Sequence, residues 1–186
     1  MQESKTEFRV VTVREVVEAI RKNGLEHLRG EWFAQFDGKI TGGCVLGQAA
    51  YNLGVEGHNG VYGYTEDNLF RALDKFETKS KKWFIDDEKI SQLYEDGWDT
   101  NEWEGFVGCG GTIISYNDLH SREFTYEPNP KYDPNDETSY EESELEVFKY
   151  YIPTYAGVAE MAAEVLAPYL DEVVTLKVKN YTWNPA

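Results

Sequence analysis

The sequence is poor in the features that mark membrane proteins and disulfide-rich secreted proteins. Only 2 of its 186 residues are cysteines, and no apolar run approaches the roughly 20 residues that span a bilayer. The first residues, MQESKTEFRVV, lack the charged and then apolar pattern of a secretory signal peptide. We therefore expect a cytoplasmic protein in which Cys44 and Cys109 are reduced thiols, although a disulfide between them stays open.

Basic residues are also scarce. The chain has 18 Lys and Arg against 34 Asp and Glu, which gives a formal net charge of -16. Because phosphate groups are bound by Lys and Arg, this balance argues against direct binding to nucleic acid or to an anionic membrane. The imbalance lies entirely in the second half: residues 1–85 carry 12 acidic and 12 basic side chains, whereas residues 86–186 carry 22 acidic and 6 basic ones.

Apolar and aromatic residues are plentiful, at 41% and 15% of the chain. Disordered chains lack such residues, so the composition predicts one folded domain over residues 1–186. The element pattern predicts an α+β fold with a helix-rich N-terminal half and a small mixed or antiparallel sheet from the later strands. The segment 121–146 is rich in proline and acids and is expected to be a long exposed acidic loop.

Helical periodicity recurs along the chain. Thr12 and Glu15 have the spacing of a capping box at the start of a helix that Asn23 and Gly24 would end. Five further segments are predicted to be helical: 25–36, 44–54 with Gly54 as the C-cap, 65–77 with Thr65 as the N-cap, 86–98, and 155–170, which Pro168 ends or kinks.

Strand signals are fewer and shorter. The segment 112–116, TIISY, is the strongest candidate, because it is β-branched and lies between glycine and Asn-Asp. The other predicted strands are 8–11, 147–152 and 173–178, and residues 37–43 are expected to form a turn.

Cys44 is the first candidate for chemistry, since a helix N-terminus lowers the pKa of a thiol and the thiolate is a nucleophile. A thiol enzyme also needs a histidine base and often an Asn or Asp that orients it, and His58 or His120 with Asn117 and Asp118 are the candidates. The order of Asn117 and Asp118 before His120 departs from the papain-like arrangement. The alternative, which we favour, is that Cys44 packs as a small hydrophobe.

Metal and cofactor sites are not predicted. Cys44, His58, Cys109 and His120 are of ligand type but include no close pair of the kind that marks a zinc site. The glycine-rich segment 105–112 is expected to precede a strand, whereas phosphate-binding loops open a helix.

Paired carboxylates among aromatics are the mark of a glycosidase, and Trp98, Glu102, Trp103 and Glu104 are of the right types. With 34 acids in the chain, such a grouping is expected by coincidence.

Segregated acids with interleaved aromatics are the strongest physical signal. Residues 86–104 hold eight acids and one lysine, and residues 122–146 hold nine acids and two basic residues. Such a surface suits a basic protein partner, with Tyr and Trp as anchors, although acids that serve only solubility are the alternative. The expected partner-binding residues are Asp86, Asp87, Glu88, Glu95, Asp96, Trp98, Asp99, Glu102, Trp103, Glu104, Tyr132, Asp133, Asp136, Glu137, Tyr140, Glu141 and Glu142.

Three short segments carry a resemblance. GGCVLGQAAYNLG (42–54), TIISYND (112–118) and YAGVAEMAAEVLAPYL (155–170) together resemble a family of small domains of unknown function from actinobacteria and their phages. The resemblance implies no activity, but it implies a phage or mobile-element setting and hence the host cytoplasm. The acidic segment 121–146 departs from the family pattern.

The leading hypothesis is a non-enzymatic binding protein whose acidic second half mimics nucleic acid, docks on a basic host protein surface and inhibits it. One alternative is a small thiol-dependent enzyme centred on Cys44. Another is a phage structural or assembly protein. The sequence does not fix the oligomeric state.

Overall fold

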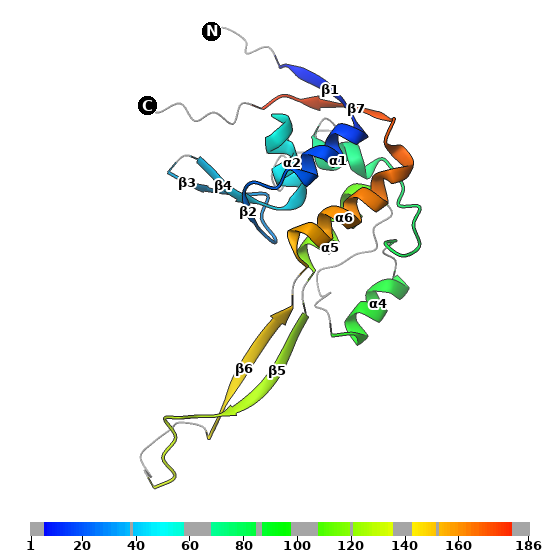
Figure 1. Ribbon diagram of the computed structural model, residues 1–186. Coiled ribbons are helices and arrows are strands. Elements are labelled where there is room, and N and C mark those ends of the chain that lie inside the picture. Colours follow the sequence, from blue (N-terminus) through cyan, green and yellow to red (C-terminus); the bar gives the residue numbers. More distant parts are fainter. Residues whose placement is uncertain are drawn as a thin grey trace.

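Helices form the centre of the structure and strands lie at its periphery (Figure 1). The computed structural model describes residues 6–37, 39–57, 68–84, 87–97, 108–119, 121–135, 143–151 and 153–179. Six α-helices and several small sheets within these residues confirm the predicted α+β class.

The helices supply most of the core. They are α1 (Val13–Arg21), α2 (Val45–Leu53), α3 (Leu69–Asp74), α4 (Asp87–Glu95), α5 (Cys109–Asp118) and α6 (Tyr155–Leu166), with the short 3-10 helix η1 (Ala167–Tyr169) after α6. Buried apolar side chains of α1, α2, α3, α5 and α6 form one cluster, in which Ile20, Leu46 and Leu166 are fully buried. No helix in the described part of the chain is long and apolar enough to cross a membrane.

The strands form three separate small sheets among the described residues rather than one. β1 (Phe8–Thr12) pairs antiparallel with β7 (Val173–Lys177), which brings the two ends of the described chain together. β4 (Lys39–Gly43) lies between β2 (Glu26–His27), which runs parallel to it, and β3 (Phe33–Phe36), which runs antiparallel. β5 (Ser121–Pro128) and β6 (Glu144–Tyr151) form an antiparallel hairpin.

Several sequence predictions are confirmed. Thr12 and Glu15 form the capping box of α1, with the Glu15 backbone N–H 3.2 Å from Thr12 Oγ1 and the Thr12 N–H 2.7 Å from Glu15 Oε2. Gly54 ends α2 in the left-handed conformation, with a φ of 64°. Pro168 lies in η1, directly after α6 ends. Helix α4 and strands β1, β6 and β7 also lie where they were expected.

The helix predicted over 25–36 and the turn predicted over 37–43 are wrong. The first segment holds β2 and β3, separated by Gly30 with a φ of 67°, and the second holds all of β4. Asp37, which precedes β4, has the turn conformation, with a φ of 49°. The spacing of apolar residues in this segment predicts a helix, but pairing with the neighbouring strands, which is a tertiary effect, outweighs that preference.

The strand predicted over 112–116 is also wrong, because these residues lie in α5. A short apolar run cannot be assigned to strand or helix from its periodicity alone. Here close packing decides: a Cβ atom at Gly110 would lie 2.5 Å from the Phe70 carbonyl oxygen of α3. The glycines before the β-branched run therefore let α5 lie directly against α3.

Segment 121–146 is not simply a loop, because residues 121–128 and 144–146 are strand. The predicted N-cap Thr65 lies outside the described residues, and the N-cap of α3 is Asn68, whose Oδ1 accepts from the Arg71 backbone N–H at 2.9 Å.

We expect Gly47→Ala to destabilise the fold. A Cβ atom at this position in α2 would lie 2.1 Å from the Trp32 carbonyl oxygen, so backbone must shift. Such overpacking costs about 1–3 kcal/mol, which exceeds the roughly 1 kcal/mol that alanine gains over glycine in a helix. Urea unfolding measures the change, with Gly24→Ala as the control because a Cβ there meets nothing closer than 3.6 Å. Equal midpoints for the two variants would contradict the close approach.

Candidate functional site

A buried polar network centred on Asn117 joins α5 to the chain around Cys44. The Asn117 side chain is 0% exposed. Its Oδ1 accepts from the Val45 backbone N–H at 3.1 Å and lies 3.0 Å from His27 Nε2. Its Nδ2 donates to the Leu28 carbonyl at 3.0 Å and to Asp118 Oδ1 at 2.8 Å. Because the amide oxygen can only accept, Nε2 is the nitrogen of His27 that carries a proton.

Gln48 satisfies a second set of backbone groups beside this network. Its buried side chain donates from Nε2 to the carbonyls of Leu25 at 3.3 Å, Glu26 at 3.1 Å and Gly43 at 2.9 Å. Its Oε1 accepts from the Leu25 backbone N–H at 3.3 Å. One residue of α2 thus connects β2 to β4, in addition to the backbone hydrogen bond from the Leu28 N–H to the Gly43 carbonyl at 3.1 Å.

Cys44 is the N-cap of α2, not a residue within it. Its Sγ accepts from the Gly47 backbone N–H at 3.2 Å, and the residue is only 3% exposed. The pKa of the Cys44 thiol is raised to about 12, mainly by burial; the Gly47 backbone N–H opposes the shift and the charge of Asp118 adds to it. Desolvation therefore outweighs the helix terminus, and the thiol stays neutral at physiological pH.

Tyr155 of α6 closes the network on its other side. Its hydroxyl donates to the Ile20 carbonyl at 2.6 Å, and its ring lies edge-on to the His27 ring with 5.3 Å between centroids. Burial, with a contribution from Cys44, raises the pKa of Tyr155 to about 12. Neither the phenol nor the thiol ionises readily, so the arrangement favours the packing interpretation of Cys44 over the nucleophile.

The histidine in contact with Asn117 is not one of the predicted bases. His58 and His120 lie outside the described residues. His27 precedes Cys44 in the sequence, whereas the papain-like order places the base after the thiol. Its neighbourhood follows from strand pairing, since His27 of β2 is in register with Gly43 of β4, one residue before Cys44.

The glycine-rich segment at Cys109 opens a helix, so the expectation that it precedes a strand is wrong. Gly108 is the N-cap of α5, and the Gly111 backbone N–H donates to Asp74 Oδ1 at 2.8 Å. A protein carboxylate already occupies this helix terminus, which argues against phosphate binding there. Cys109 and Cys44 are both buried free thiols, and burial raises the pKa of Cys109 to about 11.

No group of three or more His, Cys, Asp or Glu side chains that could hold a metal ion occurs among the described residues.

The second candidate region is the hairpin of β5 and β6, which extends away from the helices as a long two-stranded ribbon (Figure 1). Residues 121–151 carry nine acidic and three basic side chains. Three large side chains of the ribbon are well exposed: Tyr126 at 62%, Tyr132 at 43% and Leu145 at 44%. Exposed acids accompany them, namely Glu127, Asp133 and Glu144.

Helix α4 carries part of the other acidic segment. Glu88, Glu95 and Asp96 are exposed, as is Tyr94. The β5–β6 hairpin extends away from the body, and α4 lies beside the body (Figure 1).

The remaining predicted contact residues are not placed by the structure. The side chain of Asp87 is not described, although its backbone begins α4. The others lie outside the described residues: Asp86, Trp98, Asp99, Glu102, Trp103, Glu104, Asp136, Glu137, Tyr140, Glu141 and Glu142.

Comparison with protein-family models, with curated proteins and with solved structures returned no match for this chain.

We expect Asn117→Asp to destabilise the fold by about 3 kcal/mol or more, because a carboxylate oxygen would replace Nδ2 and face the Leu28 carbonyl and Asp118 in a buried site. Denaturant unfolding measures the loss. Asn135→Asp is a matched control, since the Asn135 amide also donates to a neighbouring carboxylate, Asp133 Oδ1 at 3.2 Å, but in an exposed position. A similar loss in both variants would mean that burial of the network is unimportant.

We expect both thiols to resist modification in the native state. At pH 8 a thiol with a pKa of about 12 is ionised in roughly one molecule in 10,000. Titration with a disulfide reagent before and after unfolding in guanidinium checks this, and Cys44→Ala and Cys109→Ala assign the signals. Rapid native labelling of Cys44 would revive the thiol-enzyme hypothesis.

Proposed function

We propose that this is a non-enzymatic binding protein whose acidic hairpin docks on the basic surface of another protein. The observation that carries the proposal is the projection of β5 and β6 from the body, with exposed apolar side chains among acids. Solubility alone does not call for large apolar groups at the end of an exposed ribbon.

The chain directly after β5, residues 129–132, is held by hydrogen bonds that centre on Asn129. Asn129 is buried, and its Oδ1 accepts from the Lys131 backbone N–H at 2.9 Å. The Asn129 N–H donates to the Ser143 carbonyl at 3.0 Å, and its carbonyl accepts from the Tyr132 N–H at 3.1 Å. A surface that is ordered before binding loses less conformational entropy in the complex, so this turn favours a recognition role for Tyr132.

The two kinds of exposed side chain have different roles in the proposed complex. Tyrosine supplies large contact area with few rotatable bonds, so Tyr126 and Tyr132 are the anchors. The carboxylates of Glu127, Asp133 and Glu144 raise the rate of encounter with a positive surface and discriminate against negative ones.

The partner we propose is a nucleic-acid-binding protein, because its groove is the basic surface that phosphates otherwise fill. The protein would then act as a nucleic-acid mimic that blocks this groove. On the resemblance to actinobacterial and phage domains, we propose further that the protein inhibits a host protein. The buried, neutral Cys44 supports a role without thiol catalysis.

We expect neutralisation of the hairpin acids to abolish partner binding. The test captures partners of the tagged chain from a bacterial lysate, with and without competing duplex DNA, and identifies them by mass spectrometry. The variant combines Glu127→Gln, Asp133→Asn and Glu144→Gln. The control combines Glu18→Gln, Glu31→Gln and Glu160→Gln, exposed positions outside the hairpin, and changes the net charge equally.

We expect to capture a basic protein. The native chain and the control should retain it, the hairpin variant should lose it, and duplex DNA should displace it. Equal retention by both variants would contradict docking through the hairpin. Light scattering on the same samples tests the assembly alternative, which requires a large self-associated species.

A further inference from the structure

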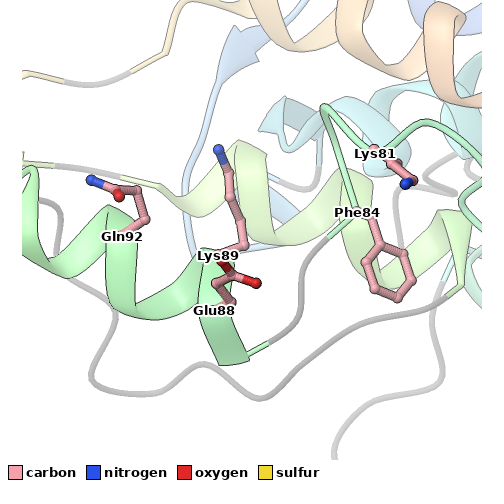
Figure 2. Close-up of a pocket in the computed structure, with 5 residues that line it drawn as sticks. All are labelled: Lys81, Phe84, Glu88, Lys89 and Gln92. Atoms are coloured by element: carbon pink, nitrogen blue, oxygen red, sulfur yellow. The ribbon is translucent and has the colours of Figure 1, made fainter.

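A cavity of about 540 Å³ lies between the turn at residues 81–84 and the first two turns of α4 (Figure 2). Its volume is in the range of small-molecule sites. The described side chains that line it are Lys81, Phe84, Glu88, Lys89 and Gln92. Two lysines, one glutamate and an aromatic ring thus line one space, in a chain whose net charge is -16.

The lysines in residues 79–82 differ in the groups that they contact. The Lys82 ammonium lies 3.2 Å from Glu164 Oε2 and stacks over the Trp83 ring at 4.2 Å. The Lys79 ammonium lies 4.8 Å from the centre of the Tyr169 ring. Lys81, in contrast, makes no hydrogen bond or ion pair with any described residue. An ammonium without a partner at the wall of a cavity is a ready donor for an anion.

The described lining of the cavity is positive although the whole protein is negative. It holds two lysines and one glutamate, a net charge of +1. The segment before it, residues 75–85, adds further lysines, and Asp86 and Asp87 follow that segment in the sequence. Lys89 adds a cation from α4, and the helix dipole places its positive end at the same end of α4. Glu88 is the opposing charge in the lining. Because charges are screened over about 8 Å at physiological salt, the acids of the distant hairpin do not cancel this local excess.

Phe84 supplies an apolar, aromatic wall of the cavity. It is half-buried, and its ring makes no aromatic contact with another described residue. Figure 2 shows Phe84 and Lys81 on the turn, opposite Glu88, Lys89 and Gln92 on α4. A flat ring placed against Phe84 would gain stacking contact while its anionic group lies toward the lysines.

We infer that this cavity binds a small aromatic anion, with the ring against Phe84 and a phosphate or carboxylate held by Lys81 and Lys89. The inference goes beyond the proposed function and does not depend on it, since none of these residues belongs to the hairpin.

Titration with phenyl phosphate, followed by backbone amide shifts in NMR spectra of the labelled full chain, tests the inference. We expect saturable binding with a Kd on the order of 1 mM, which suits a ligand of this size, and shifts centred on residues 81–92. Benzoate should bind at the same place. Inorganic phosphate, which lacks the ring, should bind at least about tenfold more weakly, and benzylamine, with the opposite charge, should not bind.

Matched variants separate charge from shape. Lys81→Gln and Lys89→Gln should each raise the Kd for phenyl phosphate about tenfold, whereas Glu88→Gln should lower it severalfold by removing the opposing charge. Phe84→Leu keeps an apolar side chain but removes the ring. In this variant phenyl phosphate should bind no more tightly than inorganic phosphate. Lys177→Gln on β7 is the control and should leave the Kd unchanged.

Three outcomes would each overturn the inference. They are the absence of saturable binding, binding of benzylamine with the same affinity, and a Kd for phenyl phosphate that does not change in Lys81→Gln and Lys89→Gln. Tighter binding in Glu88→Gln cannot arise from a damaged fold, so this variant keeps the test decisive even where another variant unfolds.

Discussion

The hydrogen bonds of the Asn117 side chain are the interaction on which the arrangement of the body depends. This single amide connects α5 to the start of α2, to the residue after β2 and to His27. Those segments are too short to fix one another: β2 has only two residues, and the first N–H groups of α2 need acceptors from outside the helix. A buried amide that uses all its donors and acceptors orders them at little cost, whereas any change that leaves one unpaired is expensive.

Small residues make this network fit. The Trp32 carbonyl lies where a Cβ of Gly47 would stand, and the Phe70 carbonyl lies close to Gly110 in the same way. Because these two glycines have no side chain, the neighbouring backbone can lie close to α2 and α5, at the short distances that buried hydrogen bonds require. Cys44 belongs to this arrangement, because its sulfur caps α2 from a position that a larger side chain would not fit.

The parts of the fold that the sequence predicts correctly are those with local causes. The capping box at Thr12, the left-handed Gly54 and the break at Pro168 each act within a few residues. The errors come from contacts distant in sequence. TIISY is helical because α5 packs against α3, and β2 is a strand only through its pairing with β4. Asn117 was named as a candidate, but its contact with His27 joins residues 90 positions apart, which no local pattern could indicate.

The fold depends little on charged side chains. The core is apolar, and Asp118 is the charged member of the Asn117 network. The ion pairs Arg9–Glu15, Arg14–Asp171 and Lys82–Glu164 lie at the surface, where each contributes little. The acids of the hairpin therefore repel one another on a ribbon that extends from the body rather than within the body. Residues 121–151 carry nine acidic and three basic side chains, a net charge of -6, so part of the total of -16 lies on the segment that forms this ribbon.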